Sequence, residues 1–394
     1  MDQVDFKNKD RLVLPKNKSM LIKHQVKDYF HIFKHTAMGM DIKTWIRVVA
    51  QYRFAISWSL LPKALFITLI ATLNTPFQLI EYLFFDRKIK ATVVKRPIFI
   101  LGHHRSGTTY LHNLMSTDPQ LAFCTTNDAL VPHLMLTTGK ITEKIVDLFM
   151  PATRPQDNVK AGAKLPTEEE FGMANMSTTS FTHAFYFPKY IQEIFDHTVT
   201  FEGGYNDNSN QWKNNLHYLI QKLTYKNQGK QLVLKSPSNT ARVKEIRELY
   251  PDALFVHIHR NPYEVFQSNT ALYNKILPIL SFHTTTTEAI EAFIIRSYTL
   301  LHRKYLADQS DIPDSQIIEV AYEDFVRDPM EQLQSIYQQL RLENFDQART
   351  VIKQEVKQSN NYQKNQHLSL SPSQIKAINT QWQFFFEAYG YEMI

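Results

Sequence analysis

The chain has 394 residues, of which 43% are apolar and 21% are charged, a balance typical of globular proteins and not of disordered or collagen-like chains. Its 44 Lys and Arg residues against 38 Asp and Glu residues give a mild net charge of +6, which suits an anionic substrate or membrane surface and gives no basis for a nucleic-acid partner. The one cysteine, Cys124, excludes an intramolecular disulfide and a multi-cysteine metal site, and it suits the cytoplasm.

The N-terminal part of the chain is predicted to be helical and apolar. The first 20 residues mix charged and apolar side chains and lack the apolar core of a signal peptide. Residues 64–80 carry no charge, but they fall short of the ~20 residues that span a bilayer and contain Asn74-Thr75-Pro76. We expect two short buried helices here, with an apolar surface resting on a membrane as the alternative.

From residue 97 onward, strand and helix patterns alternate. Apolar runs predict strands at 97–101, 232–234, 253–258 and 317–320, and residues 121–225 are interpreted as inserted helices and loops. Helix starts are predicted where a capping side chain precedes proline, at residues 261, 328 and 371, and a helix end at Gly390. The predicted fold is therefore α/β, a P-loop-like parallel sheet flanked by helices over residues 96–394, with an N-terminal helical, apolar extension over residues 1–95.

The most specific local feature is a glycine-bounded turn between a predicted strand and a predicted helix. Residues 102–109 read Gly-His-His-Arg-Ser-Gly-Thr-Thr and directly follow the strand at 97–101. A tight turn that leads into a helix aims several backbone N–H groups at one point, and the helix dipole adds partial positive charge there. The turn therefore predicts a phosphate site.

This turn differs from a nucleoside triphosphate loop in two ways. Thr108 stands where the GxxxxGK[ST] loop has the lysine that reaches the β- and γ-phosphates. His259 and Arg260 follow the strand at 253–258, where a Walker-B-like strand would offer a metal-binding aspartate. The fixed cation of the turn is Arg105, so we expect anion transfer stabilised by side-chain cations, without an obligatory metal.

Two further cations follow other predicted strands. Lys235 comes directly after the strand at 232–234, and Arg260 lies at the end of the next strand. In an open α/β sheet, ligands bind at the carboxyl ends of the strands. Ser268 lies about two helical turns beyond Arg260, on a face that can point back toward it. An arginine and a hydroxyl at one place predict a second phosphate site.

With two phosphate sites on one sheet edge, the sequence resembles the sulfotransferase family that uses 3′-phosphoadenosine-5′-phosphosulfate (PAPS), and is most similar to its bacterial-type members. Residues 105–109, Arg-Ser-Gly-Thr-Thr, resemble the family's 5′-phosphosulfate loop, [KR]-S-G-T-T. Arg260 and Ser268 are similar, with the same separation, to the arginine and serine of its 3′-phosphate site. The resemblance runs from about residue 97 to the C-terminus and includes weaker matches at residues 318–329 and 361–365.

The resemblance implies a role for each matching residue. Arg105 and Lys235 would contact the sulfuryl group and the leaving phosphate, where negative charge develops. Arg260 and Ser268 would select the 3′-phosphate, and hence PAPS over ATP. The other donor-binding residues that the resemblance implies are Ser106, Gly107, Thr108 and Thr109 of the loop, Tyr110 for adenine stacking, and Lys364 of the C-terminal loop.

The acceptor hydroxyl also needs a general base. Pro237 and Asn239 stand where relatives carry a histidine, so this segment offers none. The resemblance implies three carboxylates as candidate bases, because bacterial-type relatives carry acids at the positions of Asp128, Glu168 and Glu170, and His104 of the turn is a further candidate. Glu168 and Glu170 would share one side of an extended segment, with a solvated helix start as the alternative. For His104 the alternative is a role in shaping the loop through hydrogen bonds.

The acceptor is predicted to be a hydroxyl compound that binds among residues 128–190 and the N-terminal helices. The aromatic and methionine side chains there favour a hydrophobic alcohol or lipid if they line a cavity. Two other functions stay open, a P-loop kinase that uses ATP and a non-catalytic PAPS-binding protein of the same fold. We expect a PAPS-dependent transferase with a small-molecule or lipid-like acceptor, no metal and no nucleic acid, located in the cytoplasm with peripheral membrane contact as an option.

Overall fold

The computed structural model describes residues 20–394 apart from 26–27, 29–34, 154–158, 203–204 and 360–368. At its centre is a five-stranded sheet in the order β3-β4-β2-β5-β7, with every neighbouring pair parallel. The strands are β2 (Ile98–Leu101), β3 (Leu121–Phe123), β4 (Gln231–Lys235), β5 (Leu254–His259) and β7 (Ile317–Ala321), and a separate antiparallel ribbon pairs β1 (Leu21–Ile22) with β6 (Thr285–Thr286).

The parallel sheet and the four strands predicted from apolar runs are confirmed. β3 was missed, because its three residues are too few to give a strand pattern. β2 lies between β4 and β5, so the chain order reverses on either side of it. Loops that follow such strands leave a crevice at the carboxyl edge of the sheet. The turn at residues 102–107, Lys235 and Arg260 all lie at this edge.

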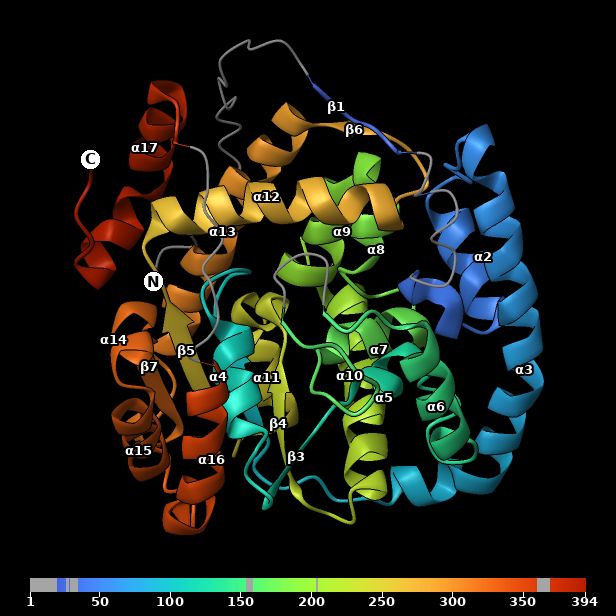
Figure 1. The fold of residues 1–394 in the computed structure, drawn as a ribbon, viewed down its shortest axis with the longest axis horizontal. Helices are drawn as coiled ribbons and strands as arrows, with labels where there is room; N and C mark the ends of the chain where they lie inside the picture. The colour runs from blue at the N-terminus through green and yellow to red at the C-terminus, as the bar shows by residue number, and fades with distance from the viewer. Residues whose placement is uncertain (1–19, 26–27, 29–34, 154–158, 203–204, 360–368) are drawn as a thin grey trace.

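Both faces of the sheet are buried because successive side chains of a strand point to opposite faces. Ile98 and Ile100 of β2 belong to one hydrophobic core, and Phe99 and Leu101 belong to another. A third core lies among helices and joins the N-terminal helices to the C-terminal helix. Figure 1 shows α3 along one side of the molecule, α14 to α16 along the other, and α12 above the sheet in this view.

The helices begin and end at the predicted signals. The side chain of Asn261 accepts hydrogen bonds from the N–H groups of Tyr263 and Glu264, and Gly390 ends the last helix with a φ of 68°. The first helices of the chain are α2 (Ile42–Gln51), α3 (Leu61–Lys90), α4 (Thr108–Met115), α5 (Thr126–Leu130), α6 (Gly139–Phe149), α7 (Glu169–Met176), α8 (His183–Tyr186) and α9 (Ile191–Phe195). They are followed by α10 (Tyr205–Lys226), α11 (Val243–Leu249), α12 (Pro262–Leu280), α13 (Thr287–Gln309), α14 (Tyr322–Arg327), α15 (Pro329–Gln339), α16 (Phe345–Ser359) and α17 (Pro372–Tyr389). Short 3-10 or π turns are η2 (Thr36–Gly39), η3 (Trp58–Leu60), η4 (Pro188–Tyr190), η5 (Asp196–Thr200), η6 (Pro237–Ala241) and η7 (Asp314–Gln316).

The prediction of two short buried helices within residues 64–80 is wrong. These residues belong to α3, a single helix of 30 residues that contains Pro76 and exposes most of its apolar side chains. The two residues that precede Pro76 hold the helix in place through side-chain hydrogen bonds to other parts of the chain. Asn74 Nδ2 donates to the Met38 carbonyl at 2.8 Å, and Thr75 Oγ1 accepts from the Ile42 N–H at 3.0 Å. These bonds fix the turn at which the proline removes an N–H donor.

A cluster of buried histidine and aromatic rings lies next to the turn. The ring of His302 in α13 lies 4.3 Å from Tyr298, 4.5 Å from Phe385 and 6.1 Å from His103. Neither ring nitrogen of His302 has a hydrogen-bond partner among the described residues. Burial, and then the neighbouring histidines, hold the pKa of His302 well below its usual value. Burial likewise lowers the pKa to about 3 or 4 for His35, His103, His133, His183 and His259.

We expect the free energy of unfolding to fall on acidification from pH 7.5 to 5.5. The unfolded chain protonates these imidazoles near pH 6.5, whereas the native state keeps them neutral to about pH 3 or 4. The unfolded state therefore binds more protons in this window. As the pH is lowered, the free energy of unfolding decreases by up to about 1.4 kcal/mol per pH unit for each histidine. Buried carboxyls such as Glu169, whose pKa burial raises to about 7, oppose this trend but are fewer. Equilibrium denaturation at pH 7.5, 6.5 and 5.5 measures the slope.

Two matched variants assign the slope to the histidines. His302→Phe removes a titrating ring that makes no described hydrogen bond, so stability at pH 7.5 should stay near that of the wild type while the slope flattens. His183→Phe should flatten the slope too, but it also breaks the 3.1 Å hydrogen bond to the Ala174 carbonyl, at a cost of about 1 kcal/mol at pH 7.5. A wild-type slope in both variants would contradict the prediction.

Candidate functional site

The predicted phosphate turn connects β2 to α4 and depends on two glycines. Gly102 and Gly107 have φ values of 136° and 100°, in the region that favours glycine. A Cβ on Gly102 would lie 2.3 Å from the Ile258 carbonyl oxygen, and one on Gly107 would lie 2.3 Å from the Tyr322 ring. The first N–H groups of α4 have no partner within the helix, so they can bind an anion at the turn.

Hydrogen bonds to the surrounding elements hold this turn. Ser106 Oγ donates to the His103 carbonyl at 2.7 Å, and the Gly102 N–H donates to Thr240 Oγ1 of η6 at 2.7 Å. Ser106 and Thr108 are buried, whereas Thr109 is half-buried at the start of α4. The hydroxyl of Ser106 therefore supports the shape of the turn.

The three residues assigned from different parts of the sequence meet at this turn. Arg105 has a φ of 73°, an uncommon conformation for a residue with a side chain, and its Nε donates to Ser268 Oγ of α12 at 2.8 Å. Arg260 follows β5, and its Nη1 donates to the Arg105 carbonyl at 3.1 Å. Arg105 thus links the other two residues, through its guanidinium to the Ser268 hydroxyl and through its backbone carbonyl to the Arg260 guanidinium.

The side chain of Arg260 is also fixed from two other sides. Its Nε donates to Glu264 Oε2 at 2.9 Å, one helical turn further on. The guanidinium carbon lies 4.3 Å from the centre of the Tyr322 ring, the same ring that packs against Gly107. Stacking on an aromatic ring orients the planar guanidinium, so Arg260 is held toward the turn.

Lys235 ends β4 as predicted, and its ammonium group is buried in an ion pair. Its Nζ lies 2.5 Å from Glu168 Oε1, with the lysine side chain 1% exposed and the glutamate side chain 19% exposed. The Lys235 backbone N–H donates to Glu169 Oε2 at 3.0 Å, and Asn239 Nδ2 donates to Glu169 Oε1 at 2.6 Å. Burial raises the pKa of Glu169 to about 7.

The expectation that Glu168 and Glu170 share one side of an extended segment is wrong, because α7 begins at Glu169 and Glu168 occupies its N-cap position. This helix start is also not solvated, since Glu169 and Glu170 are buried. Glu170 pairs with the buried Arg242, whose Nη1 lies 2.7 Å from Oε2. Burial alone would raise the pKa of Glu170, but Arg242 and hydrogen bonds from residues 180 and 181 hold it below its ordinary value. The two carboxylates therefore face different cations.

Asp128 is not brought to this cluster. Its buried carboxylate lies 2.5 Å from Lys226 Nζ at the end of α10. It also closes a capping box at the start of α5, because the Thr125 N–H donates to Asp128 Oδ2 and the Asp128 N–H donates to Thr125 Oγ1. These contacts give Asp128 a role in holding α5 against α10.

His104 lies in the turn beside both cations of the transfer site. Asn269 Nδ2 donates to the His104 carbonyl at 2.8 Å, while His104 Nε2 is buried and has no hydrogen-bond partner among the described residues. Burial first, and then the charges of Lys235 and Arg105, lower the pKa of His104 to about 3. The ring is therefore neutral at physiological pH.

Two further residues, Tyr110 and Lys364, were predicted to bind the sulfuryl donor. Tyr110 is half-buried near the start of α4, with its ring 5.4 Å from that of Phe325. Lys364 lies outside the described residues. No group of three or more His, Cys, Asp or Glu side chains that could hold a metal ion is found among the described residues.

Several residues that build the site were missed from the sequence. They are Glu169 and Asn239, which brace β4, Arg242, which pairs with Glu170, Thr240, which bonds the turn, and Tyr322, which stacks on Arg260. The capping pattern around Glu169 signalled a helix start, but a buried arginine such as Arg242 has no local sequence signal. Its partner is fixed only by the packing of α7 against η6.

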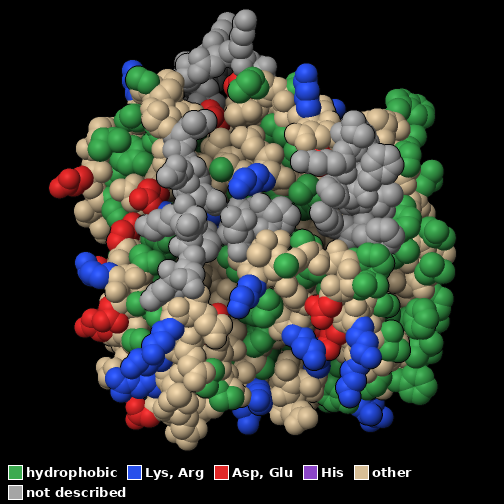
Figure 2. Space-filling model, in the orientation of Figure 1, with side chains coloured by type: hydrophobic (Ala, Val, Ile, Leu, Met, Phe, Trp, Pro, Cys, Tyr) green, Lys and Arg blue, Asp and Glu red, His purple; other side chains and the backbone are tan. Residues whose placement is uncertain are grey.

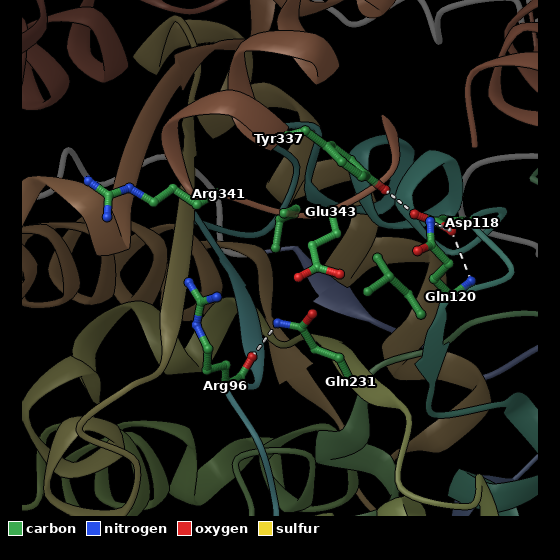
Figure 3. A pocket seen from close by; sticks show the side chains of 9 residues that line it. Arg96, Asp118, Gln120, Gln231, Tyr337, Arg341 and Glu343 are labelled. Carbon is green, nitrogen blue, oxygen red and sulfur yellow. Dashed lines mark hydrogen bonds between the residues drawn. The ribbon is translucent and has the colours of Figure 1, made fainter. Parts of the chain in front are cut away.

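The cavity drawn in Figure 3 is separate from this site. It has a volume of about 240 Å³ and lies at the amino-terminal edge of the sheet, where Leu121 begins β3 and Gln231 begins β4. Some of its polar side chains are engaged with the protein, since the Tyr337 hydroxyl donates to Asp118 at 2.7 Å and an Arg96 guanidinium nitrogen donates to the Leu340 carbonyl at 3.1 Å. The candidate site is at the opposite edge, where the turn and both strand-end cations lie.

Solved structures with this architecture are known. The sulfotransferase STF9 from Mycobacterium avium superposes with a TM-score of 0.67 at 16% identity, covering 93% of this chain and 97% of that one. The sulfotransferase STF1 from Mycobacterium tuberculosis superposes with a TM-score of 0.59 at 18% identity, covering 85% and 93% of the two chains. These similarities confirm the predicted fold.

Sequence comparison identifies the family. The chain is 27% identical over 356 residues to omega-hydroxy-beta-dihydromenaquinone-9 sulfotransferase Stf3 from Mycobacterium bovis and from Mycobacterium tuberculosis, and the match covers 90% of this chain and 91% of the relative. A family model described as the sulfotransferase family matches residues 97–347, more than half of the chain, from the strand before the turn to the start of α16. The chain therefore belongs to the sulfotransferase family.

Proposed function

We propose that this sulfotransferase takes its sulfuryl group from PAPS, bound with its two phosphate groups at the carboxyl edge of the sheet. The observation that supports this most is the meeting of Arg105, Ser268 and Arg260 at the turn. Their contacts include a hydroxyl, a backbone carbonyl and the half-exposed carboxylate of Glu264. Such partners hold a guanidinium weakly compared with a phosphate, which accepts charge-assisted hydrogen bonds.

Each group would then act on a different part of the donor. PAPS supplies a sulfuryl group whose transfer leaves adenosine-3′,5′-bisphosphate (PAP). The N–H groups at the start of α4, with Thr108 and Thr109, would hold the 5′-phosphate. Arg260 and Ser268 would hold the 3′-phosphate. Lys235 would neutralise charge on the leaving oxygen, and its burial strengthens that interaction because few water molecules screen it.

Arg105 connects these two phosphate sites. Its backbone belongs to the turn, but its side chain is bonded to Ser268 of the 3′-phosphate site. To reach the sulfuryl group as proposed, Arg105 must exchange this hydroxyl for a phosphosulfate oxygen. Occupation of Ser268 by the 3′-phosphate would release the guanidinium, so binding at one site would prepare the other.

Glu168 is the proposed general base. Its carboxylate already lies against Lys235, and its side chain is partly exposed, so an acceptor hydroxyl can approach it. When Lys235 turns toward the leaving oxygen, this carboxylate is left facing the reaction centre. Glu170 and Asp128 are instead held in buried ion pairs away from it. His104 is a second candidate, because its Nε2 is buried near Lys235 and Arg105 and has no hydrogen-bond partner among the described residues.

The proposed acceptor is the hydroxyl group of a lipid-like alcohol. The relative Stf3 is named for a hydroxylated menaquinone derivative and matches this chain over 90% of its length. Helix α7, which begins beside Glu168, packs against η2, and η2 packs against the apolar α3. A hydrophobic acceptor therefore has apolar protein surface next to the proposed base.

Donor selectivity is the first test of this proposal. PAP should raise the melting temperature, with an added stability of about 2.7 kcal/mol at a concentration of 100 times its Kd, because it binds the native state only. ADP with Mg²⁺ should give a much smaller shift, since Thr108 replaces the phosphate-binding lysine. Thermal denaturation with each ligand measures this. Equal shifts would favour the kinase alternative.

The division of labour between cations can be tested with two variants. Lys235→Met should lower kcat by about 10²–10³-fold while leaving PAP affinity within a few fold, because its interaction grows as the leaving oxygen gains charge. Arg260→Ala should instead weaken PAP binding by about 10–100-fold, corresponding to the loss of a charge-assisted hydrogen bond. Calorimetric titration of PAP and the release of PAP from PAPS with a terminally hydroxylated isoprenoid alcohol measure the two effects. Similar losses of affinity in both variants would refute the assigned roles.

The base is tested by comparing Glu168→Gln with His104→Gln. We expect Glu168→Gln to lower kcat by about 10²–10⁴-fold, as for loss of a general base, with PAP affinity preserved. His104→Gln keeps a hydrogen-bonding side chain in the turn and should lower kcat only a few fold. The reverse ranking in the same assay would assign the base to His104.

A further inference from the structure

The outward face of α3 is apolar along its whole length. From Leu65 to Phe84 its exposed side chains are uncharged, and the charged residues Lys63 and Glu81 are turned inward and buried. The exposed apolar residues of this helix, which we call the α3 face, are Leu65, Leu69, Leu73, Phe77, Leu79, Ile80, Tyr82, Leu83 and Phe84. A helix of 30 residues is about 45 Å long. Figure 2 shows hydrophobic side chains along this side of the molecule.

Neighbouring elements extend the α3 face. Helix α6 exposes Ile141, Ile145 and Leu148 at spacings that place them on one side of the helix, and Leu148 is 77% exposed. At the other end, Phe54 and Trp58 precede α3, and Trp58 is 88% exposed. A soluble monomer rarely gathers so many exposed, large apolar side chains without a partner.

The inward face of α3 is fixed to the protein by polar contacts. Lys63 Nζ donates to the Ile279 carbonyl at 2.9 Å near one end, and Glu81 pairs with the buried Lys222 of α10 near the other. Residues Trp58–Lys90 are long and apolar enough to cross a membrane by length and composition alone. Crossing would expose the buried charges of Lys63 and Glu81 to lipid, which is costly. The helix therefore suits a membrane surface better than a span.

Cations border this apolar surface. Arg53 precedes α3, Arg87 and Lys88 lie in its last turn, and Lys140 and Lys144 lie on α6, all with exposed side chains. The nearby carboxylates are engaged, since Asp86 pairs with Lys90, Glu143 pairs with Lys164, and Asp147 accepts from the Ala163 N–H. Lys88 and Lys90 also lie within 6 Å of the Phe85 and Tyr82 ring centres. Apolar side chains bordered by aromatic rings and cations are typical of a membrane interface.

We propose that the α3 face binds peripherally to a bilayer that contains anionic phospholipid, with α3 lying flat on the surface. A second copy of the chain is the other occupant to consider. In a two-fold dimer, the same cationic border would face itself, so like charges would repel. An anionic lipid surface instead complements both the apolar face and its border. The link to catalysis rests on the proposed lipid-like acceptor, which could reach Glu168 from the membrane past η2 and α7.

Vesicle sedimentation tests this proposal. The full chain should bind vesicles of phosphatidylcholine with 30% phosphatidylglycerol about tenfold more strongly than vesicles of phosphatidylcholine alone, and salt should reduce the difference. Leu73→Glu with Phe84→Glu should lower binding to the anionic vesicles at least about tenfold, because each change puts a charge into the interface. Arg87→Ser with Lys88→Ser should remove most of the preference for anionic lipid.

The matched control is Val351→Glu on α16, which adds the same charge at another exposed apolar residue and should leave vesicle binding unchanged. PAP-induced thermal shifts should be normal in every variant, so a failure of the donor proposal would be distinguishable from a failure of membrane binding. The proposal is overturned if wild-type chain does not sediment with anionic vesicles. It is also overturned if light scattering shows a dimer that Leu73→Glu with Phe84→Glu dissociates, since the face would then be a contact between copies.

Discussion

The pairing of buried charges between α7 and the neighbouring strand and turn is the constraint on which the candidate site depends. Lys235 and Arg242 are both buried, and each faces a glutamate from the first turn of α7 or its N-cap. Removing one partner would leave an uncompensated buried charge, which costs several kcal/mol. The helix start is thereby tied to β4 and η6. The same pairing presents Glu168 at the only ammonium group that ends a central strand of the described sheet.

These two ion pairs differ in a way that matters for chemistry. Glu170 and Arg242 are fully enclosed, and further hydrogen bonds saturate the carboxylate, so this pair acts as a fixed support. The Glu168 side chain is 19% exposed, so its pair with Lys235 is less enclosed. The structure therefore combines a fixed, enclosed pair, which positions α7, with a more exposed pair at the end of β4. The proposed polyanionic donor would need cations whose partners can be exchanged, and only the second pair is suited to this.

The sheet and its ligand edge could be predicted because their signals are local. Apolar strands, the two glycines of the turn, and capping residues such as Asn261 each act within a few neighbouring residues. The partners of the glutamates could not be predicted in this way, since Glu170 and Arg242 are 72 residues apart in the chain. Asp128 shows the same limit, because its partner Lys226 is 98 residues away in the chain. The ion-pair partner of an acidic side chain is set by tertiary packing, so the sequence alone does not distinguish a structural carboxylate from a functional one.

Helix α3 also depends on contacts that are distant in the sequence, both for its continuity and for its exposed apolar side. Its proline and its apolar composition predicted a break and burial, but a helix can pass through a proline where tertiary bonds hold the adjoining turn in place, as the bonds of Asn74 and Thr75 do here. The polar residues that interrupt the apolar run are the ones that fasten the helix to the protein. Ala64, Ile67 and Ala71 pack into the core beside them, and the larger apolar residues on the opposite side of the helix are left outside. A segment of apolar residues alone would have suited a buried helix or one that spans a membrane. In α3, polar residues anchor one side of the helix to the protein, and the other side is apolar.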